Sequence, residues 1–447
     1  MDRLFGTDGI RATAGSYPLD SDSVFTLGKG LISLLKKNNM PPLVLIGRDT
    51  RESGEWLEQA LTQGIRTAKG NVTSCGVIPT SAVSYLTKKH GFSAGIVISA
   101  SHNPYQDNGI KIFSSTGMKI SEDWEKELEK SLKSSPEKTT RSRHDISPVF
   151  QFRKDYIEFL KNSFSASLPD PPPGIVLDCA NGSAYEIAPL VFRELGFPVS
   201  AISTSPDGKN INDGCGALHP GRLARAVLDK KAAMGIAFDG DADRAIWVDE
   251  KGRILNGDHT LFVLSKFMQH KNLLRSSCVV ATTMSNIGLE LALEKMGIKM
   301  ARAPVGDKYV LENMIRLKSN LGGEQSGHTI LLDTCPTGDG ILTGLKILEA
   351  MLSQNIPLSR LVEGFRQYPQ VLLNIPVTQK KPFETFPDFQ TTREQIQNRL
   401  GATGRLNVRY SGTELLARIM VEGKDETEIE GYARQIADII KKNSGLP

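Results

Sequence analysis

A loop serine and three carboxylates at alternate positions are the residues of this chain best suited to catalysis. Ser101 lies in the polar stretch 99–107, directly after the apolar run 94–98. A short run rich in β-branched residues predicts a buried strand, and the small residues and the His-Asn-Pro sequence after it predict a tight, solvent-facing loop. A serine hydroxyl is a weak nucleophile by itself, so Ser101 would need a base, a charge or a metal to activate it.

The three carboxylates belong to Asp239, Asp241 and Asp243, which follow the apolar run 236–238. Alternate residues of an extended chain point to the same side. Three converging carboxylates repel one another and raise one another's pKa, and a hard divalent cation such as Mg²⁺ removes that penalty. A loop serine and a carboxylate triplet together indicate covalent phosphoryl chemistry beside a bound Mg²⁺.

Both motifs also have plainer explanations, since the serine stretch fits an ordinary turn and the aspartates fit an acidic surface turn. An EF-hand calcium loop matches the aspartate spacing, but its sixth position needs glycine and holds Arg244, and residues 245–248 are typical of a strand. The spacing around Ser101 contains neither a Ser-His-Asp triad nor a Gly-x-Ser-x-Gly elbow. A non-catalytic sugar-phosphate binding module is a further alternative.

Two more polar clusters suit a sugar phosphate. Glu324, Ser326 and His328 offer an acceptor, a hydroxyl and an imidazole at alternate positions, which fits a polyhydroxyl ligand as well as it fits a polar hairpin. In residues 409–414 an arginine can fork onto a phosphate, while hydroxyls and successive N–H groups form an anion nest. Three further cations lie near turns or near this nest: Arg11, Lys308 and Arg418.

Composition excludes several classes of protein. The 447 residues are 39% hydrophobic and 23% charged, and the net charge of +4 comes from scattered basic pairs, so we expect no nucleic-acid partner. No apolar run approaches the roughly 20 residues that cross a bilayer. Charges stand at the N-terminus where a signal peptide needs an apolar region, so we expect a cytoplasmic protein without a membrane partner. The five cysteines are widely spaced and predict no disulfide.

An apolar strand, a small polar turn and a helix recur three times along the chain. The strand-and-turn segments and their helices are 43–51 with 55–65, 175–183 with 184–195, and 279–286 with 287–296. Such units predict α/β layers with largely parallel strands. Polar or proline-bearing connectors are expected at 133–148, 169–173 and 372–389. The tail after Gln390 predicts a helix, a strand pair and a helix, which suggests a smaller α+β domain after three related α/β domains.

Two of the predicted helices have a clear apolar face. In helix 55–65 this face consists of Leu57, Ala60, Leu61, Gly64 and Ile65. In the final helix, expected over 425–442, it consists of Ile429, Ala433, Ile436 and Ile440. Residues at this spacing line one side of a helix, so both helices are expected to pack against a sheet or another helix.

Taken in order along the whole chain, the motifs resemble those of the α-D-phosphohexomutase superfamily. The matching segments are 6–11, 47–51, 99–104, 108–111, 239–244, 323–328 and 409–414. The sugar loop around Gln325 and the segment 210–219 are similar to the branch that acts on glucosamine phosphates, whereas the glucose and mannose branch carries Met in place of Gln325. Ser81 and Leu415 depart from the family pattern, which has proline at both positions.

The resemblance implies a fold of four domains around one central cleft. It implies a phosphoserine-bearing domain (1–150), a metal-binding domain (151–257), a sugar-binding domain (258–367) and a phosphate-binding domain (368–447). Ser101 would be the phosphorylated residue. One Mg²⁺ would be held by Asp239, Asp241 and Asp243, with a phosphate oxygen on Ser101 completing its ligands.

The implied activity is that of an isomerase, an intramolecular phosphotransferase, that interconverts glucosamine 6-phosphate and glucosamine 1-phosphate. A sugar 1,6-bisphosphate would be both the intermediate and the activator, and the product would serve amino-sugar nucleotide synthesis for cell-wall precursors. Glu324 and Ser326 would bind sugar hydroxyls. The residues implied for phosphate binding are Arg409, Ser411, Gly412 and Thr413, with Arg418 and Lys308 as further substrate-binding residues. The groups implied for proton transfer or charge stabilisation are Arg11, His102, Lys111 and His328.

Two enzyme alternatives stay open, and so does the oligomeric state. The same reaction on glucose or mannose phosphates differs only in one substituent of the sugar. The Asp-Gly-Asp sequence is also similar to the nucleophile pair of aspartyl-phosphate phosphatases, which would carry the phosphate on Asp239 rather than on Ser101. Dimeric family members suggest a homodimer, and the residues decide neither this nor which group acts as the general base.

Overall fold

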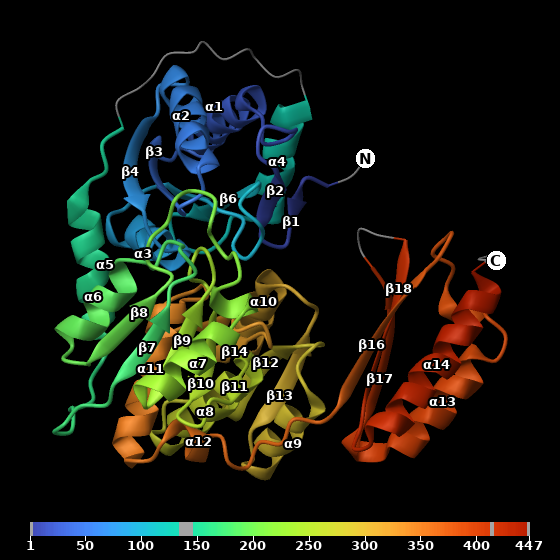
Figure 1. The fold of residues 1–447 in the computed structure, drawn as a ribbon. Coiled ribbons are helices and arrows are strands. Elements are labelled where there is room, and N and C mark those ends of the chain that lie inside the picture. Colours follow the sequence, from blue (N-terminus) through green and yellow to red (C-terminus); the bar gives the residue numbers. More distant parts are fainter. Residues whose placement is uncertain (1–2, 134–145, 412–414, 445–447) are drawn as a thin grey trace. The chain divides into compact units, whose positions relative to one another are not determined.

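The computed structural model describes residues 3–133, 146–411 and 415–444, and within them the chain forms four β-sheets (Figure 1). The chain divides into two units. The first consists of residues 1–284 and 301–362, and the second of residues 285–300 and 363–447. Most of the predicted connector 133–148 lies outside the described residues.

The first sheet has six strands in the order β1–β2–β6–β5–β3–β4. Strand β3 runs parallel to β4 and β5, whereas β6 runs antiparallel to β5 and β2. The strands are β1 (Phe5–Gly6), β2 (Gly9–Thr13), β3 (Leu43–Arg48), β4 (Asn71–Val77), β5 (Ala94–Ile98) and β6 (Asp107–Ser114). The helices of this part are α1 (Ser21–Lys37), α2 (Ser53–Thr67), α3 (Thr80–Lys89) and α4 (Glu122–Lys133). Strand β5 is buried at all five residues, as expected for a strand covered on both faces.

Two glycines let α1 and α2 lie close together (Figure 1). A Cβ on Gly64 would lie 2.0 Å from the carbonyl oxygen of Phe25, and a Cβ on Gly28 would lie 2.6 Å from that of Leu61. A larger residue at either glycine would push the helices apart. Because α2 begins just after Arg51, this packing fixes the segment on which Arg51 stands.

The second sheet has the order β11–β10–β9–β7–β8, with β7 parallel to β8 and β9, and β10 antiparallel to β9 and β11. Its strands are β7 (Ile175–Asp178), β8 (Val199–Ile202), β9 (Met234–Phe238), β10 (Ala245–Asp249) and β11 (Ile254–Leu255). The helices around it are α5 (Phe150–Asn162), α6 (Ile187–Glu194) and α7 (Gly221–Lys230). A short 3₁₀ turn, η1, spans Gly216–Leu218.

The third sheet has the order β13–β12–β14–β15, in which β12 and β14 are parallel and β14 and β15 are antiparallel. Its strands are β12 (Cys278–Thr282), β13 (Lys299–Ala303), β14 (Leu321–Gly323) and β15 (Thr329–Leu331). The helices of this stretch of sequence are α8 (Gly257–His270), α9 (Ile287–Lys295), α10 (Asp307–Leu317), α11 (Gly340–Gln354) and α12 (Leu358–Leu361). Helix α9 belongs to the second unit.

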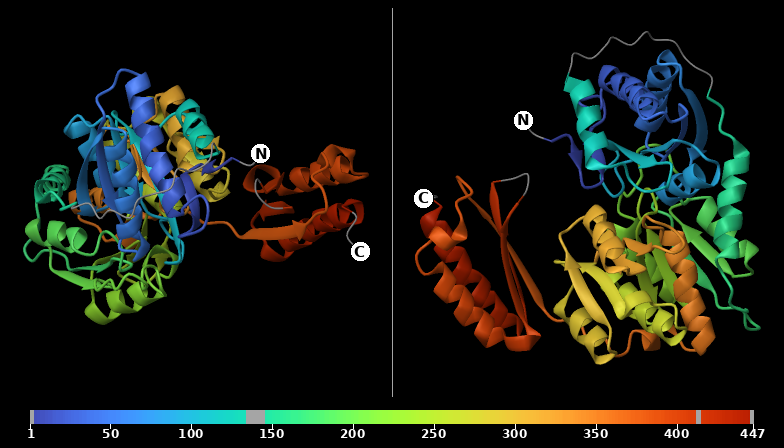
Figure 2. Two further views of the ribbon diagram at one scale, coloured as in Figure 1. Left: turned by 90° about the horizontal axis from the view of Figure 1, so that it is seen from above. Right: turned by 180° about the vertical axis from the view of Figure 1, so that it is seen from behind.

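The C-terminal sheet is fully antiparallel in the order β16–β18–β17. Its strands are β16 (Gln370–Pro376), β17 (Arg405–Tyr410) and β18 (Leu416–Glu422), and its helices are α13 (Phe389–Leu400) and α14 (Glu426–Asn443). Figure 2 shows both helices on one face of this sheet. A common core joins them, and it includes Phe389, Ile396, Ile419, Ile436 and Ile440.

The predicted fold class is confirmed: three α/β sheets of mixed direction precede a smaller α+β domain. The three sheets are related strand by strand. Strands β3, β7 and β12 hold equivalent places, and each is followed in the sheet by a parallel strand (β5, β9, β14) and then by an antiparallel one (β6, β10, β15). The apolar faces predicted for α2 and α14 are buried.

Two local predictions were wrong. Helix α6 begins at Ile187 rather than at residue 184, because the preceding turn packs on another loop: Ser183 N–H donates to Gly240 O at 2.8 Å. The segment 372–389 was expected to be a connector, but its first residues complete β16. Pro376 is tolerated there because β16 is an edge strand of its sheet and Pro376 is its last residue.

The five cysteines are all free and buried, in agreement with the prediction of no disulfide. Burial raises the pKa of the Cys335 thiol to about 12 and raises that of Cys215 as well. Thiols in such surroundings are unreactive. Among the described helices, none is long and apolar enough to cross a membrane.

Candidate active site

Three loops of the first unit meet, and each connects equivalent strands of one of the three related sheets. They are the β5–β6 loop with Ser101, the β9–β10 loop with the three aspartates, and the β14–β15 loop with His328. Ser101 Oγ donates a hydrogen bond to Asp239 Oδ2 at 2.5 Å. Arg244 and His328 form an isolated antiparallel bridge between the second and third loops. The hairpins, rather than the strand–turn–helix units of the sequence pattern, therefore bring the predicted residues together.

The prediction that Ser101 faces solvent was wrong, because its side chain is completely buried. The β9–β10 loop covers it so closely that a Cβ on Gly240 would lie 2.5 Å from Ser101 O. His102 lies within hydrogen-bonding distance, with 3.4 Å between Ser101 Oγ and His102 Nδ1. Burial, with Arg244 and Arg11 nearby, lowers the pKa of His102 to about 4, so its imidazole is neutral at pH 7.

A chain of buried hydrogen bonds supports the backbone of Ser101. Ser99 Oγ accepts from Ser101 N–H at 2.9 Å and donates to Asp49 Oδ2 at 2.5 Å. Arg51 Nε donates to the same Asp49 oxygen at 2.9 Å. Asp49 and Arg51 belong to a motif that was recognised in the sequence without a role, and no local pattern could have shown that they lie beneath Ser101.

The three aspartates fit a divalent metal ion. All three are buried, and one carboxylate oxygen from each lies within 4.8 Å of the others. In the described part of the chain, Asp241 Oδ1 and Asp243 Oδ1 are buried without a hydrogen-bond partner, so they are available to ligate a cation. Burial, together with repulsion from Asp243 and Asp241, raises the pKa of Asp239 well above its usual range. An ion such as Mg²⁺, which prefers carboxylate oxygens, would remove that repulsion.

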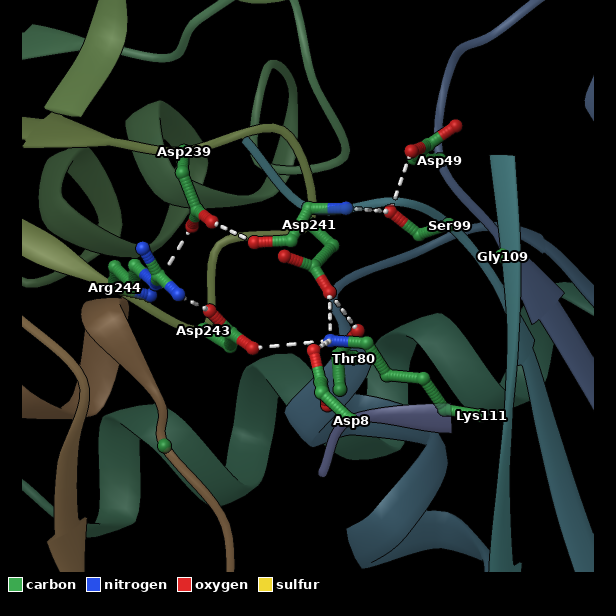
Figure 3. Close-up of polar contacts among 12 residues, drawn as sticks. Asp8, Asp49, Thr80, Ser99, Gly109, Lys111, Asp239, Asp241, Asp243 and Arg244 are labelled. Carbon is green, nitrogen blue, oxygen red and sulfur yellow. Dashed lines mark hydrogen bonds and ion pairs between the residues drawn. The ribbon is translucent and has the colours of Figure 1, made fainter. Parts of the chain in front are cut away.

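Lys111 of β6 provides a cation within the carboxylate cluster. Its Nζ lies 2.8 Å from Asp241 Oδ2, 3.1 Å from Asp243 Oδ2 and 2.9 Å from Asp8 Oδ2, and Figure 3 shows the lysine extended toward all three. Burial acts to lower the pKa of Lys111, but the three carboxylates outweigh it and raise the pKa well above its usual value. Lys111 is therefore a fixed positive charge at the site.

Asp8 pairs with several cations of the site, although its sequence context did not predict it as a site residue. It pairs with Arg11 at 2.5 Å and, through its second oxygen, with Lys119 at 2.6 Å. Burial acts to raise the pKa of Asp8, but Lys111, Lys119 and Arg11 hold it well below its usual range. Arg11 also donates to Asn103 Oδ1 in the β5–β6 loop at 3.2 Å. Asp8 thus aligns Arg11 and Lys111 toward the Ser101 loop.

Arg244 and His328 complete the charged surroundings of Asp243. Arg244 Nε lies 3.8 Å from Asp243 Oδ1 and is buried without a hydrogen-bond partner among the described residues. His328 Nδ1 lies 3.6 Å from Asp243 Oδ2, and Gly338 N–H donates to His328 Nε2 at 3.1 Å. Burial and the hydrogen bond that Nε2 accepts favour the neutral imidazole of His328, whereas carboxylates led by Asp243 act to raise its pKa.

Thr80, at the start of α3, fixes one aspartate from outside the cluster. Its hydroxyl donates to Asp241 Oδ2 at 2.5 Å, and its N–H donates to Asp241 O at 3.0 Å (Figure 3). We predict that Thr80→Val, which keeps the shape but removes the hydroxyl donor, weakens Mg²⁺ affinity by about 10–100-fold, the usual effect of losing a partner behind a metal ligand.

Isothermal titration with Mg²⁺ measures this effect of Thr80→Val. The matched control is Thr87→Val, because Thr87 is a buried threonine of the same helix whose hydroxyl donates to Val83 O of that helix. Equal Mg²⁺ affinity in the two variants would show that Thr80 does not position Asp241.

The predicted sugar-binding residues occupy the β14–β15 hairpin. Ser326 is exposed, and its hydroxyl lies 3.4 Å from Glu324 Oε2, while Glu324 Oε1 accepts from Gly306 N–H at 3.0 Å. Gln325 instead turns to the start of α8, where its amide donates to Asp258 Oδ2 at 3.3 Å. His328 points to the metal cluster rather than to the side of Ser326. The loop thus carries an exposed serine, Ser326, and a buried histidine, His328, beside Asp243.

Lys308 was predicted to bind substrate, and the structure places it outside the aspartate cluster. Its Nζ lies 3.1 Å from Glu122 Oε1 and 3.4 Å from Glu125 Oε2. The neighbouring Asp307 pairs with Lys119 at 2.5 Å. A substrate-binding role for Lys308 would require it to leave these carboxylates, so that role stays a prediction.

The phosphate-binding residues predicted in the C-terminal domain lie on adjacent strands of the second unit. Arg409 of β17 stands directly opposite Arg418 of β18. Arg418 donates to Ser411 Oγ at 3.2 Å. Burial and the charge of Arg418 lower the pKa of Arg409. Two guanidinium groups opposite each other repel unless an anion lies between them, so this pair suits a phosphate. Gly412 and Thr413 lie outside the described residues.

Four family models match consecutive parts of this chain. All four describe domains of phosphoglucomutase/phosphomannomutase: α/β/α domain I at residues 2–139, α/β/α domain II at 154–252, α/β/α domain III at 256–368, and the C-terminal domain at 372–439. Together they account for most of the chain and follow the order of its sheets.

Curated relatives match over the full length. The phosphoglucosamine mutase of Koribacter versatilis (strain Ellin345) is 45% identical over 99% of this chain and 98% of its own length. That of Syntrophobacter fumaroxidans (strain DSM 10017 / MPOB) is 44% identical over all of both chains.

Solved structures share the fold. A phosphoglucomutase/phosphomannomutase family protein from Burkholderia thailandensis matches with a TM-score of 0.81 at 22% identity, over 100% of this chain and 99% of that one. The N-acetylphosphoglucosamine mutase of Aspergillus fumigatus, solved in complex with GlcNAc-6P and magnesium, matches with a TM-score of 0.69 at 16% identity, over 99% of this chain and 96% of that one.

Proposed function

This chain belongs to the phosphoglucosamine mutase family and is an isomerase that interconverts glucosamine 6-phosphate and glucosamine 1-phosphate, and we propose that the phosphoryl group passes through Ser101. Relatives named for glucosamine favour this substrate over the glucose or mannose phosphates of the wider superfamily. The proposal concerns the route: a phosphoserine enzyme and a 1,6-bisphosphate that stays bound between two transfers.

The main support for this route is the contact between Ser101 and the carboxylate cluster. The Ser101 hydroxyl lies 2.5 Å from Asp239, both side chains are buried, and Asp241 and Asp243 bring further negative charge close by. A phosphate on Ser101 would not be tolerated there without cations. Lys111 and Arg244 are two such cations, and a metal ion would be the third.

Asp239, Asp241 and Asp243 would hold Mg²⁺, because each offers a buried carboxylate oxygen, and Asp241 Oδ1 and Asp243 Oδ1 have no hydrogen-bond partner among the described residues. When bound, Mg²⁺ would withdraw charge from the phosphoryl oxygens and orient the phosphate for in-line transfer. The protein's own share is then to position the reacting groups and to neutralise charge, which is the main requirement of phosphoryl transfer.

In the first transfer, the 1-hydroxyl oxygen of glucosamine 6-phosphate attacks the phosphorus on Ser101. A new C1–O–P linkage forms as the bond between phosphorus and Ser101 Oγ breaks. The hydroxyl proton must leave to a nearby group, and Ser101 Oγ recovers a proton when it departs. Arg11, Lys111 and His328 are the candidates for charge stabilisation and proton transfer, and the neutral imidazole of His102 is a candidate acceptor.

In the second transfer, the 1,6-bisphosphate has turned over, and Ser101 Oγ attacks the phosphorus at position 6. Ser101 Oγ gives up its proton to a nearby group, the bond between that phosphorus and the 6-oxygen breaks, and the 6-oxygen takes up a proton, which regenerates phosphoserine and releases glucosamine 1-phosphate. We propose that Glu324 and Ser326 bind the sugar hydroxyls in both orientations. The proposed ligands of the phosphate that is not being transferred are Arg409, Ser411, Gly412, Thr413 and Arg418.

Turnover of three substrates tests the assignment to glucosamine. Glucosamine 6-phosphate, glucose 1-phosphate and mannose 1-phosphate are assayed side by side with Mg²⁺ and a trace of glucose 1,6-bisphosphate. We expect kcat/KM to be highest for glucosamine phosphate, by about 10-fold or more, because a polar site discriminates between a hydroxyl and an amine by its hydrogen bonds. Equal or faster turnover of glucose or mannose phosphate would retain the route but overturn the substrate.

A further inference from the structure

The segment 210–219 resembles that of the glucosamine branch, yet none of its residues has a role in the proposed phosphoryl transfer. In the structure its Asn212 contacts the turn that carries Ser101. We propose that Asn212 is a positioning residue that holds Ser101 in register with the metal-binding aspartates. This inference rests on the proposed role of Ser101 as the phosphoryl carrier.

Asn212 binds the backbone of the β5–β6 loop at two points. Its Nδ2 donates to Ser101 O at 2.9 Å and to Asn103 O at 3.2 Å. Arg51 donates to the same two carbonyl oxygens, at 3.0 Å and 2.8 Å. Arg51 comes from the first sheet and Asn212 from the segment after β8 of the second sheet, so the two donors hold the turn from two domains.

Asn212 is itself held in place. Its backbone has a left-handed conformation, with φ of 59°, which asparagine tolerates better than most residues with a side chain. Its N–H donates to Ala180 O at 2.9 Å, and the preceding Ile211 is buried. A donor fixed in this way can impose a position on the carbonyls that it binds.

Gly240 of the β9–β10 loop lies close to both Ser101 and Asn212. A Cβ on Gly240 would lie 2.5 Å from Ser101 O and 2.9 Å from Asn212 Nδ2. The Ser101 turn, the Asn212 segment and the loop with Asp239 are therefore packed against one another without room for a methyl group. Asn212 belongs to the same domain as Asp239, so its two hydrogen bonds tie Ser101 directly to the domain that carries the metal ligands.

Loss of these two bonds should misplace Ser101 relative to Asp239 without changing the groups proposed to bind substrate. A displacement of about 1 Å at a reacting atom can lower a rate about 100-fold. We expect kcat to fall by about 10–100-fold in Asn212 variants. The KM for glucosamine 6-phosphate should stay within about 3-fold, because a change confined to the transition state appears in kcat.

The test uses two variants and a matched control in the full-length enzyme. Asn212→Gly keeps the left-handed backbone accessible and removes the donor. Asn212→Asp keeps the shape but places a carboxylate oxygen against two carbonyl oxygens, so its effect should be larger. The control is Asn272→Gly, since Asn272 is an exposed asparagine with φ of 57°. Each is assayed for kcat, KM, melting temperature and the rate of Ser101 phosphorylation by glucose 1,6-bisphosphate, measured by intact mass.

The proposal predicts that both Asn212 variants load phosphate on Ser101 at least about 10-fold more slowly than the wild type and the control, with KM nearly unchanged. Wild-type loading and kcat in Asn212→Gly would overturn it. A lower melting temperature with unchanged kcat would also overturn it, because the role would then be structural only. If the wild-type enzyme itself acquires no phosphate on Ser101, the proposed route fails, and the inference fails with it.

Discussion

Ser101→Ala should lose sustained mutase turnover, with kcat at least about 10⁴-fold below the wild type, because removing a covalent nucleophile leaves only binding and charge stabilisation. The hydroxyl is the atom that lies against Asp239, and its loss removes both the phosphoryl acceptor and the carrier. Alanine fits the space left by a buried serine, so the fold should survive. The measurement is glucosamine 1-phosphate formation from glucosamine 6-phosphate with the bisphosphate activator present.

Ser33→Ala is the control for this variant, since Ser33 is an exposed serine of α1 whose hydroxyl bonds only within its own helix. It should retain wild-type activity. A second control is the melting temperature of Ser101→Ala, which should lie within a few degrees of the wild type. Activity above a few per cent in a folded Ser101→Ala protein would contradict the proposed phosphoserine route.

Asp241→Asn should lower both Mg²⁺ affinity and kcat/KM, because it changes a proposed metal ligand itself. Each loss should exceed the roughly 10–100-fold that follows when a metal ligand loses only its hydrogen-bond partner. Asp241 has one oxygen bound to Thr80 and Lys111, and its other oxygen has no hydrogen-bond partner within the residues that the structure describes. An amide keeps the shape but removes the negative charge that attracts the cation. Isothermal titration with Mg²⁺ and the mutase assay measure the two effects.

Asp249→Asn is the matched control for Asp241→Asn. Asp249 is equally buried and lies at the opposite end of β10, where it pairs with Arg253 at 2.6 Å. This control should lose stability but not Mg²⁺ affinity. If Asp241→Asn binds Mg²⁺ as tightly as the wild type, the ion lies elsewhere and the triplet is only a charged cluster.

The sequence predicted elements whose pattern is local. Helices α2 and α14 bury the apolar faces that their spacing indicates, and strand β5 has the expected bounds. The aspartates at alternate positions do converge, but through the tight turn between β9 and β10 rather than along the extended chain that was expected. Periodicity and turn residues act over a few positions, so a single sequence is sufficient to predict them.

The groups that support the site depend on contacts between distant segments, and the sequence could not reveal them. Ser101 was expected at the surface, but it is buried by a loop almost 140 residues away in the chain, whose Asp239 accepts its hydrogen bond. Thr80, Asp8 and Asn212 likewise act through partners that are far away in sequence. Asp8 and Asn212 lie in segments that were noted for their resemblance to the family, and Thr80 precedes the departure at Ser81, but a resemblance does not show which atoms meet.

One departure from the family pattern has a clear physical explanation. Ser81 stands where the family resemblance leads us to expect proline, and its hydroxyl lies 2.9 Å from the hydroxyl of Tyr156. Tyr156 in turn donates to Asp339 Oδ2 at 2.9 Å, and all three side chains are buried. The serine therefore takes part in a buried polar network that proline could not join. Leu415, the other departure, is exposed, and its carbonyl accepts from Val377 N–H.

The most direct test of the account is to find where the enzyme carries phosphate. The wild-type protein is incubated with glucose 1,6-bisphosphate labelled with ³²P, digested and mapped by mass spectrometry, and the labelled enzyme is then chased with glucosamine 6-phosphate. We predict one phosphate per chain on Ser101, stable to hydroxylamine and fully transferred to sugar in the chase. Label on Asp239, or label on Ser101 that glucosamine 6-phosphate does not remove, would contradict it.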